Sequence, residues 1–206
     1  FNINFGGSEG NVAVGLANLG IETYYVTRLP ENEVTGKCIR HLKSFGVNTS
    51  FILKGGKRIG IYFAEKGAVM RPSKIIYDRE ISSFSEIKKE MFNWEEIFDG
   101  KTWFHFSGIT PALTKNCFEV LMDACNVAKD KNLKISCDLN YRKKLWNWTN
   151  KPGEIMSQLL RFVDVIMCNE EDAEKYFGIK GTEIDVKKGK IKKENYKSVA
   201  EKLTEK

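Results

Sequence analysis

Several residues that could bind a small anion follow one short apolar stretch of the sequence. Residues Ile135 to Asp138 are typical of a buried strand, and the polar loop after them carries Asn140, Tyr141 and Arg142. In open α/β sheets the ligand crevice lies beyond the carboxyl ends of the strands. An amide, a phenol and a guanidinium at such an edge could hold a polar, anionic molecule. The alternative is a surface loop in which Arg142 pairs with a nearby carboxylate.

A glycine-rich loop near the start of the chain is a second candidate site. Gly6, Gly7, Glu9 and Asn11 lie in the segment Gly-Gly-Ser-Glu-Gly-Asn, at the beginning of a predicted helix. Glycine lets a backbone approach a ligand closely, and the first turn of a helix offers N–H groups at its positive end. The segment is not a Walker loop, because no Gly-Lys-Ser/Thr follows, and it is not the dinucleotide fingerprint. A plain tight turn is the alternative.

Two tyrosines and an arginine come from predicted strands in the first part of the chain. They are Tyr62, Tyr77 and Arg79. Alternation along a strand places Tyr62 on the opposite face from Ile61 and Phe63. These residues could reach a ligand, or the two tyrosines could form a cross-strand pair in a solvated sheet.

An acidic segment opens a helix directly after a predicted strand. Asn169 and Asp172 enclose two glutamates in this segment. Acidic residues in a first helical turn complement the helix dipole, which is the ordinary interpretation. The more specific hypothesis is that they bind water molecules of a Mg²⁺ ion beside nucleotide phosphates, since Mg²⁺ prefers oxygen ligands.

Two different patterns of secondary structure are predicted along the chain. The first part has strands over residues 1–5, 22–27, 49–54, 60–65 and 74–79, and helices over residues 9–19 and 33–45. Val12, Leu16 and Leu19 share one stripe of the first helix, and Gly20 and Gly46 are the expected helix ends.

In the second part strands and helices alternate. The strands cover residues 103–107, 135–138 and 163–168, and the helices cover residues 114–130, 152–162, 170–177 and 195–206. Strands separated by about thirty residues predict βαβ crossovers in a parallel sheet covered on both faces. We therefore expect a strand-rich part with two helices over residues 1–80 and a parallel βαβ core, incomplete at its C-terminus, over residues 81–206.

Composition favours a packed globular protein without nucleic-acid or membrane partners. The 206 residues are 42% hydrophobic and 29% charged, with a formal net charge of +6. A lysine run over residues 187–193 lacks interleaved aromatic residues, so it predicts a solvated segment. No apolar run could span a membrane and no signal peptide is evident, so we expect a cytoplasmic protein. The five cysteines form no C-x-x-C pair and are expected to be reduced thiols.

Both ends of the sequence suggest further chain. Phe1 begins within a predicted strand, so we expect sequence upstream of it. The parallel sheet would also lack its next strand after the final helix.

Several of these segments together resemble the ribokinase-like, or PfkB, carbohydrate kinases. The segment from Gly6 to Gly20 is similar to the N-terminal sugar-binding signature of that family. Three further segments are similar to the 2-keto-3-deoxygluconate kinases: Tyr77-Asp-Arg79 with Ser82-Ser83, His105-Phe-Ser-Gly-Ile-Thr-Pro-Ala-Leu113, and Asp138-Leu-Asn-Tyr-Arg142 with Leu145-Trp146.

The resemblance implies an α/β fold of three layers, α/β/α, with a small β-sheet lid and with the C-terminal part of the fold missing from this chain. It implies an ATP- and Mg²⁺-dependent kinase that converts 2-keto-3-deoxygluconate into its 6-phosphate. The alternatives are another sugar kinase of the family, such as a fructokinase, or a non-catalytic protein that binds sugar acids. The apolar lid strands could also pair in a homodimer.

The resemblance also assigns roles to single residues. The substrate pocket would be lined by Gly6, Gly7, Glu9, Asn11, Tyr62, Tyr77, Arg79 and Arg142. Arg142 would pair with the carboxylate of the sugar acid, which a planar bidentate donor suits. The nucleotide would lie near Asn140, Tyr141, Arg142 and Asn169. Asp172 stands where the family has Glu, and it would support Mg²⁺ through a water molecule.

The catalytic base of the family is not recognisable in this sequence. In the family it belongs to a Gly-Ala-Gly-Asp element in the last third of the chain, and nothing after Gly178 matches that element. We therefore expect no catalytic residue among these 206 residues, a base beyond Lys206, and an inactive chain when it is tested alone.

Overall fold

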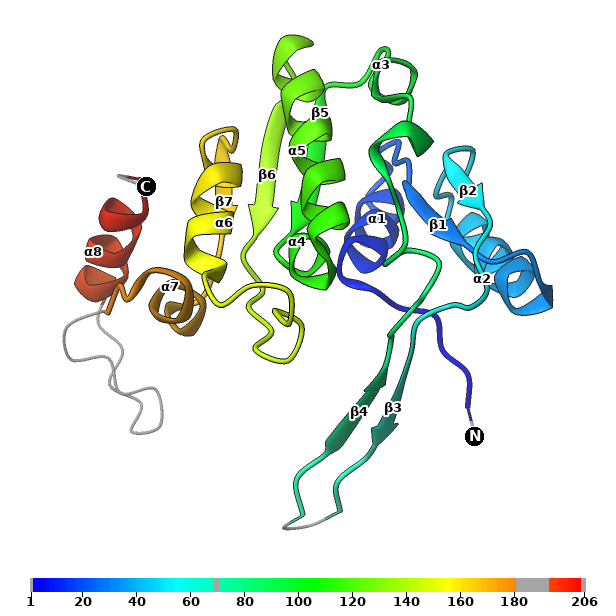
Figure 1. Cartoon of the computed structure of the whole chain (residues 1–206), viewed down its shortest axis with the longest axis horizontal. Coiled ribbons are helices and arrows are strands. Elements are labelled where there is room, and N and C mark those ends of the chain that lie inside the picture. Colours follow the sequence, from blue (N-terminus) through cyan, green and yellow to red (C-terminus); the bar gives the residue numbers. More distant parts are fainter. Residues whose placement is uncertain (1, 69–70, 181–192, 205–206) are drawn as a thin grey trace. The chain divides into compact units, whose positions relative to one another are not determined.

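The computed structural model describes residues 2–68, 71–180 and 193–204 (Figure 1). The chain separates into two compact units, Phe1–Met91 and Phe92–Lys206. The assignment of separate roles to residues 1–80 and 81–206 stays a prediction.

The first unit combines two helices with two small sheets. Its elements are α1 (Ser8–Asn18), β1 (Thr27–Leu29), α2 (Glu33–Ser44), β2 (Ile52–Lys54), β3 (Ile61–Glu65), β4 (Lys74–Asp78) and the short 3-10 helix η1 (Lys89–Met91). β1 and β2 pair in parallel, whereas β3 and β4 form an antiparallel hairpin. A small core beside β1 and β2 contains Ala13, Leu29, Leu42, Val47 and Ile52.

Both predicted helices of this unit are confirmed, but the buried face of α1 differs from the prediction. Leu19 is 77% exposed just after the helix, whereas Gly10 and Ala13 are buried. Small residues let α1 approach its neighbours closely, so the larger side chains of the predicted stripe do not define the contact face. Gly20 has a φ of 79° and follows the helix end, as expected.

The predicted strands near the start of the chain are shorter than expected or absent. Residues 2–7 form no strand, so the strand predicted over residues 1–5 is wrong for the residues that the structure describes. A strand requires a pairing partner, and alternation in the sequence does not provide one. Over residues 22–27, Tyr24 makes only an isolated bridge with Asn48, and regular pairing begins at Thr27.

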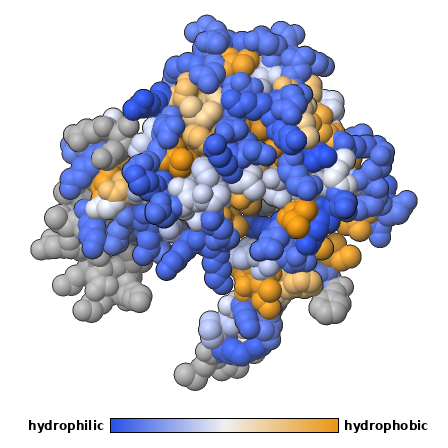
Figure 2. All heavy atoms as spheres, in the orientation of Figure 1, coloured by the Kyte–Doolittle hydropathy of each residue, from blue (hydrophilic) through white to orange (hydrophobic). Residues whose placement is uncertain are grey.

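The hairpin of β3 and β4 carries exposed apolar side chains. Tyr62 lies opposite Tyr77, and Phe63 lies opposite Ile76. Their exposed fractions lie between 37% and 52%. Figure 2 shows apolar residues gathered on this part of the surface. Since a two-stranded hairpin has no layer of its own to cover it, both of its faces remain available for contact.

The second unit is built on a parallel sheet. Its elements are α3 (Trp94–Ile97), β5 (Trp103–Ser107), α4 (Ile109–Leu113), α5 (Lys115–Asp130), β6 (Lys134–Asp138), α6 (Pro152–Leu160), β7 (Val165–Met167), α7 (Glu170–Phe177) and α8 (Lys193–Thr204). The three strands lie in the order β5, β6, β7, and both pairings are parallel. The predicted parallel sheet is therefore confirmed, with the strand over residues 163–168 shortened.

Local sequence signals explain the helix boundaries of this unit. The side chain of Thr114 caps α5 by accepting a hydrogen bond from the backbone N–H of Cys117. Pro152 occupies the first turn of α6, where its missing N–H costs nothing. Gly178 ends α7 in the left-handed conformation, with a φ of 67°.

One face of the sheet is packed and the other is more exposed. Ile135 and Cys137 of β6 are fully buried, and α5 packs against β6 with α6 beside it (Figure 1). On the opposite face Trp103, Val165 and Met167 are 54%, 42% and 46% exposed. Apolar composition predicted cover on both faces, but in the part of the chain that the structure describes this face is only partly covered.

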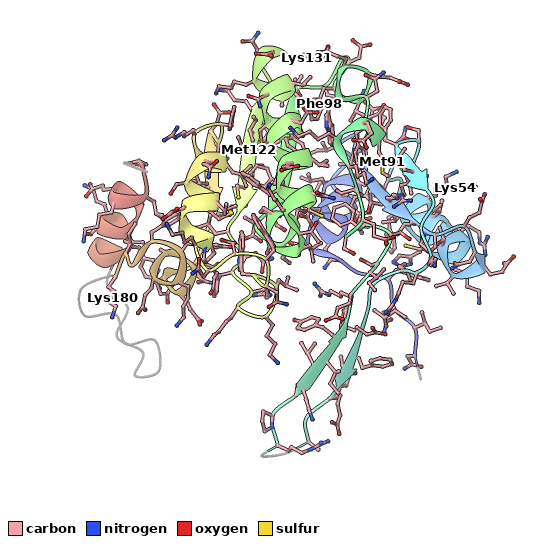
Figure 3. All side chains as sticks on the ribbon, in the orientation of Figure 1. Lys54, Met91, Phe98, Met122, Lys131 and Lys180 are labelled. Carbon is pink, nitrogen blue, oxygen red and sulfur yellow. The ribbon has the colours of Figure 1, made fainter. Side chains whose placement is uncertain are left out.

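Aromatic residues hold α3 against the sheet. Trp94 stacks on Phe98 with ring centroids 5.3 Å apart, and Phe98 contacts the Phe104 ring of β5. Lys131, at the end of α5, makes a 2.8 Å ion pair with Glu95 of α3 (Figure 3 labels Phe98 and Lys131). The sequence predictions did not include α3, because four helical residues give no readable period.

All five cysteines lie within the described residues, and all are free thiols, as predicted. Burial raises the pKa of the Cys117 thiol to about 11 and that of the Cys125 thiol to about 12, so neither is a reactive thiolate near neutral pH. No helix in the described segments has the length and apolarity needed to cross a bilayer. Most of the lysine run lies in residues 181–192, outside the described residues, so its solvated character stays a prediction.

Two helical glycines provide a matched test of the packing. A Cβ on Gly153 would lie 2.1 Å from the backbone oxygen of Tyr176 in α7, whereas a Cβ on Gly15 would have no atom within 4 Å. Gly153→Ala should therefore destabilise the protein by about 1 to 3 kcal/mol through overpacking. Gly15→Ala should stabilise it by about 0.5 to 1 kcal/mol, because alanine favours a helix interior. Urea unfolding followed by circular dichroism measures both, and equal effects would contradict the close packing of α6 on α7.

Candidate functional site

The loop after β6 lies at the carboxyl edge of the parallel sheet. Its backbone is held by hydrogen bonds from two sides: the N–H of Gly108 donates to Asp138 O at 2.8 Å, and the N–H of Leu139 donates to Met167 O at 2.9 Å. A Cβ on Gly108 would lie 2.1 Å from Leu139 O, so only glycine permits this approach. The loop is therefore fastened to the ends of both neighbouring strands.

Asn140 adopts a conformation that few residues tolerate. Its φ is 39°, in the left-handed region where asparagine is among the most common residues after glycine. Its side-chain amide lies 3.4 Å from Asp138 Oδ2. Asp138 thus shapes the loop, and Asn140 turns the chain so that the following residues leave the sheet edge.

The helix α7 begins at the same edge and is tied to this loop. The side chain of Asn169 caps α7 by accepting a hydrogen bond from the N–H of Asp172 at 2.8 Å. The carboxylate of Asp172 accepts a second hydrogen bond, from the backbone N–H of Tyr141, at 2.9 Å. Asp172 is only 6% exposed. The structure therefore brings together the predicted residues Asn140, Tyr141, Asn169 and Asp172.

Tyr141 borders a hollow of about 730 Å³. Its ring meets the Tyr176 ring edge-on, with centroids 4.9 Å apart, and Trp146 contacts Tyr176 from another direction. Lys143, Lys151 and Lys175 also line the hollow. Aromatic walls with cationic side chains suit a ligand that has a flat part and an anionic part. The sequence predictions did not include Tyr176, which lies inside a helix where aromatic residues usually serve packing.

Arg142 is exposed and its guanidinium makes a single short contact with its own loop. Nη1 donates to the backbone oxygen of Tyr141 at 3.1 Å. An exposed guanidinium retains several donors, because the group carries five N–H bonds. The alternative of a polar loop in which Arg142 pairs with a nearby carboxylate finds no support, since no ion pair involves Arg142 in the described residues.

The glycine-rich loop and the hairpin meet within the first unit. A Cβ on Gly6 would lie 3.7 Å from both Asn11 Oδ1 and the hydroxyl of Tyr62. Gly7 occupies the N-cap position of α1, where it offers no side chain to cap the helix. An amide and a phenol therefore converge on a bare stretch of backbone, which is the arrangement that a polyhydroxylated ligand requires.

Tyr77 and Arg79 extend this group of residues along the hairpin. The Tyr62 and Tyr77 rings lie 6.4 Å apart, so the cross-strand pair that was the alternative to ligand binding forms, and their role in binding stays a prediction. The Arg79 guanidinium lies 4.3 Å from the centroid of the Tyr77 ring, within cation–π distance. Next to them Arg58 pairs with Asp78 at 2.6 Å, and this hydrogen bond lowers the pKa of the Asp78 carboxyl. A hollow of about 570 Å³ is lined by Arg58, Tyr77 and Arg79.

Tyr25 supports the glycine-rich loop and was not identified from the sequence. Its hydroxyl lies 3.8 Å from the position of a Cβ on Gly7 and 3.6 Å from that on Gly10. Burial and the nearby charge of Glu9 raise the pKa of the Tyr25 phenol. Glu9 is partly buried beside it. A neutral phenol beneath the loop explains why Gly10 is buried, but a single tyrosine near a strand gives no such signal in the sequence.

The described residues offer no direct metal site. No group of three or more His, Cys, Asp or Glu side chains could hold a metal ion within the part of the chain that the structure describes. The buried Asp172 carboxylate is already engaged with the backbone of Tyr141. The residues present therefore fit direct Mg²⁺ ligation poorly, and only a role through water or through nucleotide phosphates remains open to them.

Comparisons with known proteins agree on one family. A family model described as "pfkB family carbohydrate kinase" matches residues 1–203. The crystal structure of a 2-dehydro-3-deoxygluconokinase from Thermotoga maritima is 47% identical, with a TM-score of 0.91 over 100% of this chain and 61% of that one. A 2-dehydro-3-deoxygalactonokinase from Haloferax volcanii is 30% identical over 166 residues, which are 81% of this chain and 52% of the relative.

A more distant structure, an uncharacterized sugar kinase from Pyrococcus horikoshii in complex with ATP, shares the fold. It is 21% identical, with a TM-score of 0.74 over 85% of this chain and 57% of that one. The chain thus spans between about half and three fifths of the length of these proteins. The fold is the α/β fold of the ribokinase-like kinases, as predicted, and the chain belongs to the pfkB family of carbohydrate kinases.

Proposed function

We propose that the protein containing this chain phosphorylates a sugar acid, 2-keto-3-deoxygluconate, at its terminal hydroxyl with ATP. The observation that carries the proposal is the exposed guanidinium of Arg142, presented by a loop whose backbone is fixed at the sheet edge. A planar bidentate donor matches the geometry of a carboxylate substrate, and a neutral sugar has no group that needs such a donor. The names of two relatives, the Thermotoga maritima and Haloferax volcanii kinases, both refer to deoxy sugar acids and support the same substrate class.

The proposed roles follow the chemistry of the side chains. Gly6, Gly7, Glu9 and Asn11 would contact the sugar hydroxyls, together with Tyr62, Tyr77 and Arg79 of the lid. Asn140, Tyr141, Arg142 and Asn169 would contact the nucleotide, where the aromatic and cationic lining beside Tyr141 suits it. In the reaction the substrate oxygen bonds to the γ-phosphorus as the bond to ADP breaks, and the hydroxyl proton passes to a base.

The chain's own part in the reaction would be to bind and orient. Positioning and electrostatic stabilisation carry most of the rate of phosphoryl transfer. Mg²⁺, when bound, would neutralise charge on the phosphates. A role for Asp172 toward this ion through a water molecule was predicted from the resemblance and stays a prediction.

Replacing Arg142 tests the proposed substrate class. In the gene product that contains this chain, Arg142→Ala should lower kcat/KM for 2-keto-3-deoxygluconate by about 10- to 150-fold, since charged hydrogen bonds contribute about 1.5 to 3 kcal/mol. Loss of a contact between Arg142 and the nucleotide would affect both substrates equally, so kcat/KM for fructose, which has no carboxylate, should fall at least about tenfold less than that for the sugar acid. A coupled assay measures both, with Arg161→Ala as the matched control because Arg161 is also exposed. An equal loss with both substrates would rule out the carboxylate role.

The chain alone should not turn over substrate. No Gly-Ala-Gly-Asp element follows Gly178 in the sequence, so the family's catalytic base has no counterpart here. A coupled assay on the purified 206 residues with ATP and 2-keto-3-deoxygluconate should show no activity above background. Turnover by this chain would show that one of its own residues serves as the base.

We also propose that the hairpin of β3 and β4 pairs with a second copy of the protein. Its apolar side chains are exposed on both faces, and a patch of this kind attracts a partner. Phe63→Glu should convert a dimer into a monomer in analytical ultracentrifugation, because a buried carboxylate opposes association. Leu19→Glu, at a residue 77% exposed outside the hairpin, is the control. An unchanged dimer in the Phe63 variant would place the interface elsewhere.

A further inference from the structure

Asp172 makes an unusual contact for an acidic residue in a first helical turn. A residue at its position in α7 normally serves its own helix, by complementing the dipole or by reaching back to the N-cap N–H. Here the Asp172 carboxylate instead accepts the N–H of Tyr141, 31 residues earlier in the chain, at 2.9 Å. Asn169 caps the helix separately. The carboxylate is therefore committed to the loop after β6.

The loop depends on this contact because its hydrogen bonds to the ends of the neighbouring strands, at Asp138 and Leu139, lie before the turn at Asn140. Leu139 is held by Met167 of β7, and Asn140 then turns the chain through a left-handed conformation. The Tyr141 N–H is the next donor after this turn, and Arg142 is the residue that follows. If the Tyr141 N–H lost this acceptor, it would form a hydrogen bond with another group. The backbone would then change its direction just before Arg142.

We propose that Asp172 is a positioning residue for Arg142, acting through the hydrogen bond that its carboxylate accepts from the Tyr141 N–H. The inference rests on the proposed function, because it concerns the residue that positions Arg142, the proposed binding group for the sugar acid. Three observations carry it: the 6% exposure of Asp172, its 2.9 Å contact with the Tyr141 N–H, and the separate cap by Asn169.

Two substitutions at this residue separate the roles. Asp172→Asn keeps an acceptor oxygen and removes the charge, whereas Asp172→Ala removes both. In the gene product that contains this chain, Asp172→Ala should raise KM for 2-keto-3-deoxygluconate by about 5- to 100-fold, since a buried donor loses its partner. Asp172→Asn should restore KM for the sugar acid to within about twofold of wild type, because its side-chain oxygen can still accept the hydrogen bond. Glu171→Gln removes the same charge from an exposed neighbour and is the control.

Hydrogen exchange at the Tyr141 amide gives a readout independent of activity. This amide should be protected in wild type and in Asp172→Asn, and should exchange at least tenfold faster in Asp172→Ala, in proportion to the lost hydrogen bond. If Asp172→Ala does not fold, the Asp172→Asn variant decides by itself. Loss of Tyr141 protection in Asp172→Asn, or a KM raised in it as far as in Asp172→Ala, would overturn the proposal. If the wild-type protein protects the Tyr141 amide but does not phosphorylate the sugar acid, only the proposed function is overturned.

Discussion

Parallel pairing of β5, β6 and β7 is the constraint on which the second unit depends. It places the carboxyl ends of three strands at one edge, so the loops that follow them must share a small region. Gly108 makes this sharing possible, because a side chain there would meet the backbone of Leu139 at 2.1 Å. The polar residues of the loop after β6 are thus presented by a rigid frame, which is a requirement for binding an anion with a defined orientation.

In the first unit, some of the candidate binding residues lie on an exposed hairpin instead of a sheet edge. This hairpin has no core of its own, and under the proposed function it would contribute side chains to the substrate. Tyrosines suit such an element, because the ring packs against neighbours while the hydroxyl remains polar. The contact of Arg79 with the Tyr77 ring keeps a cation at the base of this hairpin. The backbone at Gly6 has no side chain, and a Cβ there would lie 3.7 Å from the Tyr62 hydroxyl.

The sequence was sufficient for the elements that have strong periods or clear caps. The strand over residues 103–107 and the helix over residues 170–177 agree with the structure at both ends. The sequence was insufficient where contacts with other segments decide whether a strand forms or which helix face is buried. Residues 2–5 alternate like a strand but pair with nothing in the described residues, and Leu19 continues an apolar stripe that the fold leaves exposed.

The candidate site shows the same division. The residues near Asn140 and Gly6 could be selected from the sequence, because their types are those that the chemistry of an anion or a sugar favours. The positions of Tyr25 and Tyr176 beside the candidate sites could not be predicted, because the sequence does not distinguish an aromatic residue beneath a loop from a core residue. The contact between Asp172 and Tyr141 was also inaccessible, since a hydrogen bond between residues 31 positions apart depends on sheet pairing and leaves no spacing signature.

The central claim, that the protein is a kinase for a sugar acid, is tested most directly by substrate preference. Purified gene product should be supplied with ATP, Mg²⁺ and either 2-keto-3-deoxygluconate or fructose, and the products examined by ³¹P NMR. The account predicts a 6-phosphate of the sugar acid, with kcat/KM at least about tenfold above that for fructose, as one charged hydrogen-bonding pair would give. Equal or faster phosphorylation of fructose would contradict it.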